Sequence, residues 1–188
     1  MMKLDIITTQ SLSLTTNRLQ LTLMNREHLP QFKQLQCDPQ LMQFIGPMLS
    51  DSDVQKKFDD RIKPWQQQEN HWLTLMIHDK STDQFIGSIG FRVDSIECQR
   101  VEIGYLALNN AQGKGYITEA GSALIHYLFE QVQVRKIIAH CATVNTASCR
   151  VMEKLLLKRE GLLRSDFQVN DIWYDSYAYG LLNPIYNR

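Results

Sequence analysis

Short stretches of alternating apolar and polar residues recur along this chain, and such alternation is typical of strands that bury one face. Together with a few unbroken apolar runs, they predict strands at residues 18–23, 72–77, 85–91, 101–108, 136–141, 162–169 and 173–182. The polar segment 79–83 predicts a turn that joins the second and third of these strands into a hairpin.

Apolar residues at steps of three and four predict helices between these strands. Ile117, Ala120, Leu124 and Leu128 form one apolar face of a helix that begins just after residue 115. A second helix is expected from residue 146 to about 157, with Gly161 as its break, and the segment 25–69 predicts two or three short helices broken by prolines. This order of elements predicts an α/β (α+β) fold with a mixed sheet and helices on its faces.

Length and composition fit one globular domain over residues 1–188, because 44% of the residues are hydrophobic and 21% are charged. Twenty basic residues balance twenty acidic ones, which argues against a general nucleic-acid binder.

No apolar run has the length of a signal-peptide core or a membrane span, so we expect a cytoplasmic protein without membrane contact. No cysteine or histidine has zinc-ligand spacing, so we expect no metal site, and reduced, buried thiols at Cys37, Cys98, Cys141 and Cys149.

The segment 101–120 carries the most specific chemistry, because a strand runs through a glycine turn directly into a helix. Gly113 and Gly115 let backbone N–H groups approach an anion, and the start of the helix adds unpaired N–H groups and partial positive charge. These features predict a phosphate site that needs no basic patch. The spacing fits neither a Walker A loop nor a dinucleotide fingerprint, and a plain glycine turn is the alternative.

Several segments in order along the chain resemble the GNAT acyltransferase superfamily, in particular its RimJ/RimL-type branch, which acetylates protein N-terminal amines. The matching segments are TNRL at 16–19, FIGSIG at 85–90, VEIGY at 101–105, QGKGYITEA at 112–120, NTASCRVMEK at 145–154, EGLLR at 160–164 and the strand at 175–182. Asn110 departs from the usual Gln or Arg of the glycine motif. Leu156 replaces a glycine usual at a helix end, so we expect that helix to end in another way.

The resemblance implies a GNAT fold with a mostly antiparallel central sheet, an acetyl-CoA core at about residues 72–160 and acceptor-side helices at about 25–70. It implies acetyl-CoA as co-substrate, with its pantetheine arm pairing with the strand at 105–108 where that strand splays from 136–141. The implied acetyl-CoA-binding residues are Leu106, Ala107, Leu108, Gln112, Gly113, Lys114, Gly115, Tyr116, Ile117, Thr118, Asn145, Ser148 and Arg150.

The resemblance also suggests two catalytic residues. Glu102 would act as general base through a water, and Ser148 would donate a proton to the leaving thiolate. Each has a structural alternative: Glu102 as a strand carboxylate paired with an arginine, and Ser148 as a helix-capping residue. Tyr179 is a rival proton donor or a core residue.

The acceptor is the least defined part of the prediction. The resemblance implies a protein N-terminal α-amine; a small amine, an amino acid or a polyamine is the alternative. A non-catalytic CoA-binding module and a protein without a nucleotide ligand are further alternatives. The cluster Asp51, Asp53, Asp59 and Asp60 either attracts a cationic acceptor or forms a solvated helix face. We expect a monomer or a homodimer.

Overall fold

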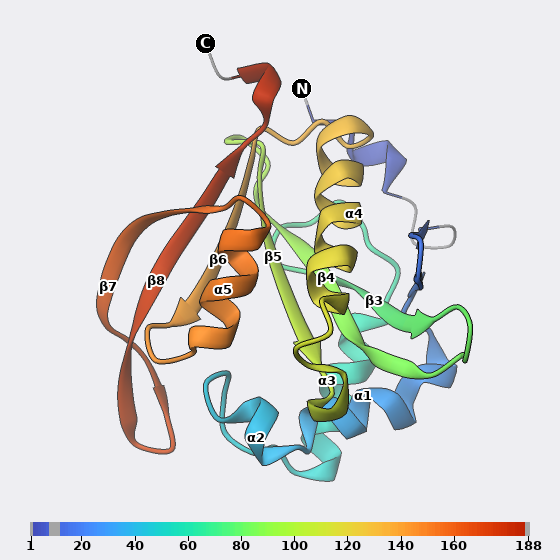
Figure 1. Ribbon diagram of the computed structural model, residues 1–188, viewed down its shortest axis with the longest axis vertical. Coiled ribbons are helices and arrows are strands. Elements are labelled where there is room, and N and C mark those ends of the chain that lie inside the picture. The colour runs from blue at the N-terminus through green and yellow to red at the C-terminus, as the bar shows by residue number, and fades with distance from the viewer. Residues whose placement is uncertain (1, 8–11, 187–188) are drawn as a thin grey trace.

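One sheet organises the chain in the computed structural model, which describes residues 2–7 and 12–186 (Figure 1). The eight strands lie in the order β1-β2-β3-β4-β5-β6-β8-β7. Among the described strands, β5 and β6 form the one parallel pair, so the sheet is mixed and mostly antiparallel, as predicted. The bounds are β1 (Ser13–Thr15), β2 (Leu19–Leu23), β3 (Trp72–Asp79), β4 (Phe85–Ser95), β5 (Arg100–Ala107), β6 (Lys136–Ala142), β7 (Lys158–Val169) and β8 (Ile172–Leu182).

The α-helices are α1 (Leu29–Gln36), α2 (Pro39–Met42), α3 (Asp51–Arg61), α4 (Tyr116–Glu130) and α5 (Thr146–Lys154). Short 3-10 turns lie at Leu4–Ile6, Arg26–His28, Asn109–Ala111 and Pro184–Tyr186. Pro30 and Pro39 lie in the first turns of α1 and α2, where we had expected breaks. The first turn tolerates proline because its N–H groups have no helical partner there.

Alternation along β3 shows that helices cover both faces of the sheet. Met76 packs in a cluster with Phe32 of α1 and Phe58 of α3. Its neighbours Leu75 and Ile77 point the other way, into the main core that also contains the buried residues of α4 and α5. We call the side of Met76 the α3 face and the opposite side the α4–α5 face; α4 and α5 lie in front of the sheet in Figure 1.

The end of α5 corrects two predictions. The helix stops at Lys154 rather than near residue 157, and Leu156 takes the left-handed conformation, with φ of 66°. The N–H of Leu157 donates to Met152 O, and that of Leu156 to Glu153 O, each at 3.0 Å. This is the Schellman ending normally built on glycine, so our expectation of a different helix end was wrong.

Because α5 ends early, at Lys154, β7 can begin at Lys158, four residues before the predicted start of that strand. Gly161 therefore lies within β7, at a register shift, and is not the break after the helix. The strand β1 was not predicted, because three residues are too few to show alternation.

The prediction of buried, reduced cysteines holds for half of them: Cys141 and Cys149 are buried, but Cys37 and Cys98 are exposed, and all four are free. No helix within the described ranges has the length and apolar character of a membrane span.

Candidate active site

A slot opens in the middle of the sheet where β5 and β6 diverge. The two strands pair over only three positions, from Arg100–Lys136 to Glu102–Ile138. Beyond them β6 pairs with β8 and β5 with β4, and Figure 1 shows the two strands separating. On its β6 side, the stretch 103–107 of β5 therefore has no strand partner in the described part of the chain. Its free backbone groups can pair with an extended ligand, and that the pantetheine arm of acetyl-CoA binds there stays a prediction from the family resemblance.

The glycine turn lies at the mouth of this slot. Gly113 and Gly115 have φ of 74° and 79°, which L-residues with a side chain rarely adopt. In the described part of the chain, the backbone N–H groups of residues 113–118 donate to no carbonyl or side chain, because α4 makes its first helical bond from Glu119 to Gly115 O. Six consecutive free N–H groups at the start of a fifteen-residue helix suit a diphosphate.

Arg18 and Glu119, two side chains far apart in sequence, hold this turn in place. Glu119 accepts hydrogen bonds from Thr16 Oγ1 at 2.5 Å, Arg18 N at 2.9 Å and Arg18 Nε at 2.6 Å. Arg18 Nη1 then donates to Lys114 O at 3.2 Å, and its guanidinium lies 4.6 Å from the ring centroid of Tyr116. With the Lys114 carbonyl held by Arg18, the N–H groups of the turn remain available on its other side.

Glu102 lies at the point of divergence, on the α3 face. Its Oε2 accepts from Arg92 at 2.6 Å, and its Oε1 lies 3.3 Å from His140 Nδ1. Burial raises the pKa of the Glu102 carboxyl, but His140 and Arg92 outweigh this, so its pKa lies below the ordinary value. The hydrogen bond from Glu102 raises the pKa of His140 against the effect of burial. Glu102 is therefore ionised at neutral pH and joined to a titratable imidazole.

Ser148 lies on the α4–α5 face, in the first turn of α5. Its hydroxyl is 3.0 Å from that of Tyr105 on β5. The cap of α5 is Asn145, whose Oδ1 accepts from Ser148 N at 3.1 Å, so the Ser148 hydroxyl does not cap the helix. Burial raises the pKa of Tyr105, which keeps its phenol protonated and able to donate. Sequence reasoning missed Tyr105, although it lies inside the VEIGY segment.

Comparisons with known proteins agree with this geometry. Residues 18–157 match the acetyltransferase (GNAT) domain family. The chain belongs to the GNAT acetyltransferase family. It is 37% identical over 86 residues to the uncharacterized N-acetyltransferase YnaD of Bacillus subtilis, covering 46% of this chain and 51% of YnaD. It is 32% identical over 98 residues to the ribosomal-protein-serine acetyltransferase of Escherichia coli, covering 52% and 54% of the two chains.

Solved structures show the same GNAT fold at low identity. The RimL ribosomal L7/L12 alpha-N-protein acetyltransferase in complex with coenzyme A aligns with a TM-score of 0.81 and 19% identity, covering 91% of this chain and 98% of that one. Spermidine N-acetyltransferase from Vibrio cholerae, in complex with CoA and spermine, aligns with a TM-score of 0.77 and 19% identity. The alignment covers 89% of this chain and 97% of that one. The chain spans about half to three-fifths of the length of the first curated relatives, at 51%, 60% and 58%.

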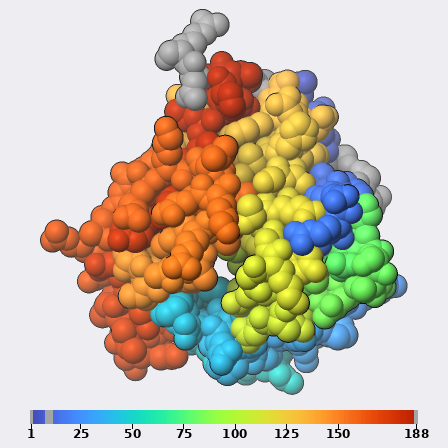
Figure 2. Space-filling model, viewed as in Figure 1, coloured from blue at the N-terminus to red at the C-terminus, as the bar shows by residue number. Residues whose placement is uncertain are grey.

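Within this GNAT fold, the predicted acetyl-CoA residues fall into three groups around the slot. Leu106, Ala107 and Leu108 end β5, and residues 112–118 form the turn and the start of α4, where Gln112 Nε2 donates to Ala107 O at 3.2 Å. Asn145, Ser148 and the exposed Arg150 belong to the start of α5. Figure 2 shows the surface hollowed between the yellow segment that leads into α4 and the orange segment of α5. Their roles stay predictions.

The rival proton donor Tyr179 is a core residue of β8. It is 1% exposed, and burial raises its pKa to about 12. Its hydroxyl donates to Glu153 Oε1 of α5 at 3.4 Å. In the structure, Tyr105 rather than Tyr179 shares a hydrogen bond with Ser148.

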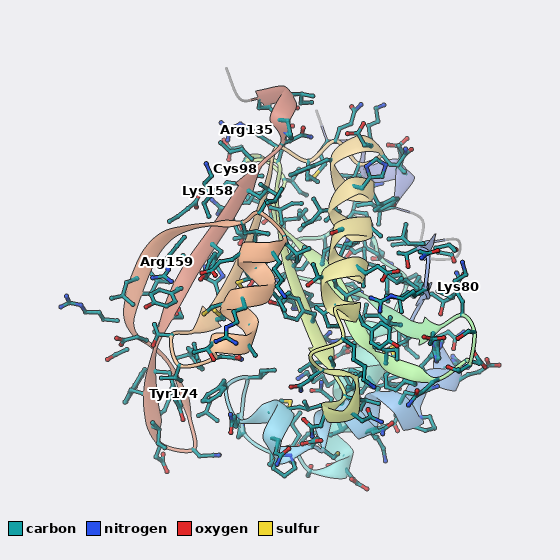
Figure 3. All side chains as sticks on the ribbon, viewed as in Figure 1. Lys80, Cys98, Arg135, Lys158, Arg159 and Tyr174 are labelled. Atoms are coloured by element: carbon teal, nitrogen blue, oxygen red, sulfur yellow. The ribbon has the colours of Figure 1, made fainter. Side chains whose placement is uncertain are left out.

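The segment after α2, which lies in the region expected to bind the acceptor, contacts the hairpin of β7 and β8. Phe44 packs edge-on against Tyr174, with ring centroids 5.7 Å apart, and Figure 3 shows Tyr174 low on that hairpin, beside the α2 segment. The acidic residues of α3 are all exposed, and three of them pair with lysines: Asp51 with Lys33, Asp53 with Lys56 and Asp60 with Lys63. They form a solvated helix face, which was one of the two predicted alternatives.

Proposed function

We propose that this chain is an acetyl-CoA-dependent N-acetyltransferase that acts on a primary amine, with a protein N-terminal α-amine as the acceptor. The observation that carries the proposal is the combination of a strand edge left open at the divergence of β5 and β6 with six free N–H groups at its mouth. This arrangement offers one long site for an extended arm that ends in a diphosphate. The ribosomal-protein-serine acetyltransferase relative supports the choice of acceptor. The cytoplasmic location stays a prediction.

The proposed reaction is a direct transfer. The neutral amine nitrogen attacks the thioester carbonyl carbon, an N–C bond forms, and the C–S bond breaks to release the CoA thiolate. The α-ammonium of a protein N-terminus has a pKa of about 8, against about 10.4 for lysine, so a weak base suffices to remove its proton. The proton goes through a water to Glu102, and the thiolate takes a proton from Ser148. Glu102 then releases its proton to solvent and Ser148 regains one from solvent, so no net proton is gained or lost by the enzyme.

Both proposed residues have supporting geometry. Glu102 is ionised and lies where the slot begins, on the α3 face. Ser148 lies on the α4–α5 face, where its hydroxyl shares a hydrogen bond with the Tyr105 hydroxyl, 3.0 Å away, which also donates to the Ser148 carbonyl at 3.1 Å. The two proton movements therefore take place on opposite faces of the sheet.

A binding experiment tests the co-substrate. Acetyl-CoA should raise the melting temperature of the wild-type protein by mass action, and Gly115→Glu should abolish the rise, because a carboxylate at a left-handed position displaces the N–H groups and repels phosphate. The matched control is Gly161→Ala, since a methyl group at Gly161 meets no atom within 4 Å. No stabilisation of the wild type would contradict the proposed function.

An activity assay then separates an enzyme from a CoA-binding module. Release of free CoA thiol is measured with N-terminal peptides, the same peptides with blocked N-termini, small amino acids and spermidine. Release that requires a free peptide α-amine supports the proposal. Stabilisation by acetyl-CoA without release from any amine identifies a non-catalytic module, and release only with spermidine identifies a polyamine enzyme.

A further inference from the structure

A row of side chains crosses the α3 face of the sheet and ends at the catalytic slot. Trp72, Arg92 and Glu102 lie directly opposite one another on β3, β4 and β5, so all three project from the same face. The indole of Trp72 reaches across to β5: a methyl group at Gly104 would lie 2.9 Å from its ring. Gly104 thus makes room for a flat aromatic surface next to Glu102.

Arg61, the last residue of α3, lies over this surface. Its guanidinium carbon is 5.4 Å from the centroid of Trp72, and that of Arg92 is 5.5 Å from the same ring. Arg61 Nη1 donates to the buried Thr74 Oγ1 at 2.9 Å. Arg61, Trp72 and Arg92 are each partly exposed, so a molecule from solvent can reach them.

The charges of this surface do not balance. Arg92 is paired with Glu102, which also binds His140. Arg61 forms no ion pair with any carboxylate of the described residues. Burial, with Arg92 nearby, lowers the pKa of Arg61 to about 10, so it is still cationic at neutral pH. Lys57, one turn earlier on α3, adds a second half-buried cation that donates to the neutral Gln36 at 2.7 Å.

From this geometry we infer that Arg61 binds a carboxylate of the acceptor, so that the preferred amine carries an acidic group close to the nitrogen. A guanidinium offers a planar fork to a carboxylate, and partial burial strengthens that bond. Glu102 lies on the same face for the ammonium end of the same molecule. The inference rests on the proposed function and gives the acceptor a chemical class. A polyamine does not fit this class, because it has no anionic group that could bind to the two arginines.

Two sources of the carboxylate fit this chemistry, an acidic side chain near a peptide N-terminus and the α-carboxylate of a free amino acid. The peptide arm compares kcat/KM for Ser-Asp-Ala-amide with that for Ser-Asn-Ala-amide, which differ only in the carboxylate. The amino-acid arm compares serine with serinamide. We expect at least about a tenfold preference for the acidic member in one arm, since a charge-assisted hydrogen bond contributes about that much or more.

Variants at residue 61 show whether this arginine provides the preference. Arg61→Met keeps the apolar stem over Trp72 and should reduce the ratio of kcat/KM between the acidic and the neutral acceptor to about onefold. Arg61→Lys should restore part of it. The control Lys56→Gln removes one charge from the exposed face of the same helix and should leave the ratio unchanged.

Two results would overturn the inference while leaving the proposed function intact: efficient transfer with no preference in either arm, or an Arg61→Met variant that slows acidic and neutral acceptors equally. The second would show that Arg61 only supports the fold of the acceptor side. An absence of transfer to every amine would instead contradict the proposed function itself.

Discussion

Arg18 and Glu119 join the N-terminal strand region to the first turn of α4, with Arg18 Nε 2.6 Å from Glu119 Oε2. The same arginine holds the Lys114 carbonyl of the glycine turn. Two motifs that the sequence showed separately, TNRL and TEA, are therefore one structural unit behind the free N–H groups. Neither side chain needs to touch acetyl-CoA to affect its binding.

Arg18→Gln should raise the KM for acetyl-CoA about tenfold and leave kcat within about threefold, because it loosens the turn but leaves Glu102 and Ser148 in place. Steady-state kinetics at saturating acceptor measure both constants. Arg164→Gln, an exposed arginine on β7, is the control. A double-mutant cycle with Glu119→Gln should show strong coupling, and additive effects would contradict a joint role.

Glu102→Gln should lower kcat by about 10²-fold or more with little change in the KM for acetyl-CoA, because the isosteric amide cannot accept the ammonium proton. The exposed Glu160→Gln on β7 is the matched control. Urea denaturation checks that the fold survives the loss of charge opposite Arg92. Activity near that of the wild type would mean that positioning and exclusion of water carry the reaction without this base.

Ser148→Ala should lower kcat by about 10²-fold if Ser148 protonates the thiolate. Tyr105→Phe keeps the ring in place and removes only the hydroxyl, which lies 3.0 Å from Ser148 Oγ, so it should cause a smaller loss. Single-turnover kinetics compare the two variants. A larger loss from Tyr105→Phe than from Ser148→Ala would reverse their roles.

The ion pair of Glu102 with His140 predicts a pH dependence of stability. Its partner raises the pKa of His140 above 6.5, so the protonated imidazole stabilises the fold fully below that value. The contribution is lost as pH rises through the raised pKa, while Glu102, whose pKa is lowered, stays ionised. The difference in unfolding free energy between wild type and His140→Gln should therefore be constant below pH 6.5 and shrink as the pH rises from there through the raised pKa of His140. A difference that grows with pH would contradict the pair.

Leu156→Gly should stabilise the protein by about 1 kcal/mol, because an L-residue in the left-handed conformation is strained by about 1–2 kcal/mol. The side chain is 74% exposed, so its removal gives up little buried surface. Urea denaturation measures the gain. Val144→Gly, at an exposed residue outside the left-handed region, should give no gain.

The order of elements and the glycine turn were predictable from sequence because both depend on local patterns. The alternation in β2 and the apolar steps of α4 reflect which side of each element meets the core, and the apolar runs of β3 and β4 fit strands that are buried on both faces. The ends were less predictable: at Leu156, two backbone hydrogen bonds and the burial of Leu155 and Leu157 outweigh the local preference of one residue. This balance cannot be predicted from the residues next to Leu156 in the sequence.

The sequence by itself determined the strand–turn–helix segment that ends in free N–H groups, because glycine conformation and helix geometry are local properties. Only the tertiary structure decided what surrounds it. Strand pairing brought Trp72, Arg92 and Glu102 into one row, and the packing of α3 placed Arg61 over them. Charge balance on that surface depends on contacts between residues distant in sequence, and those contacts exist only once the sheet has formed.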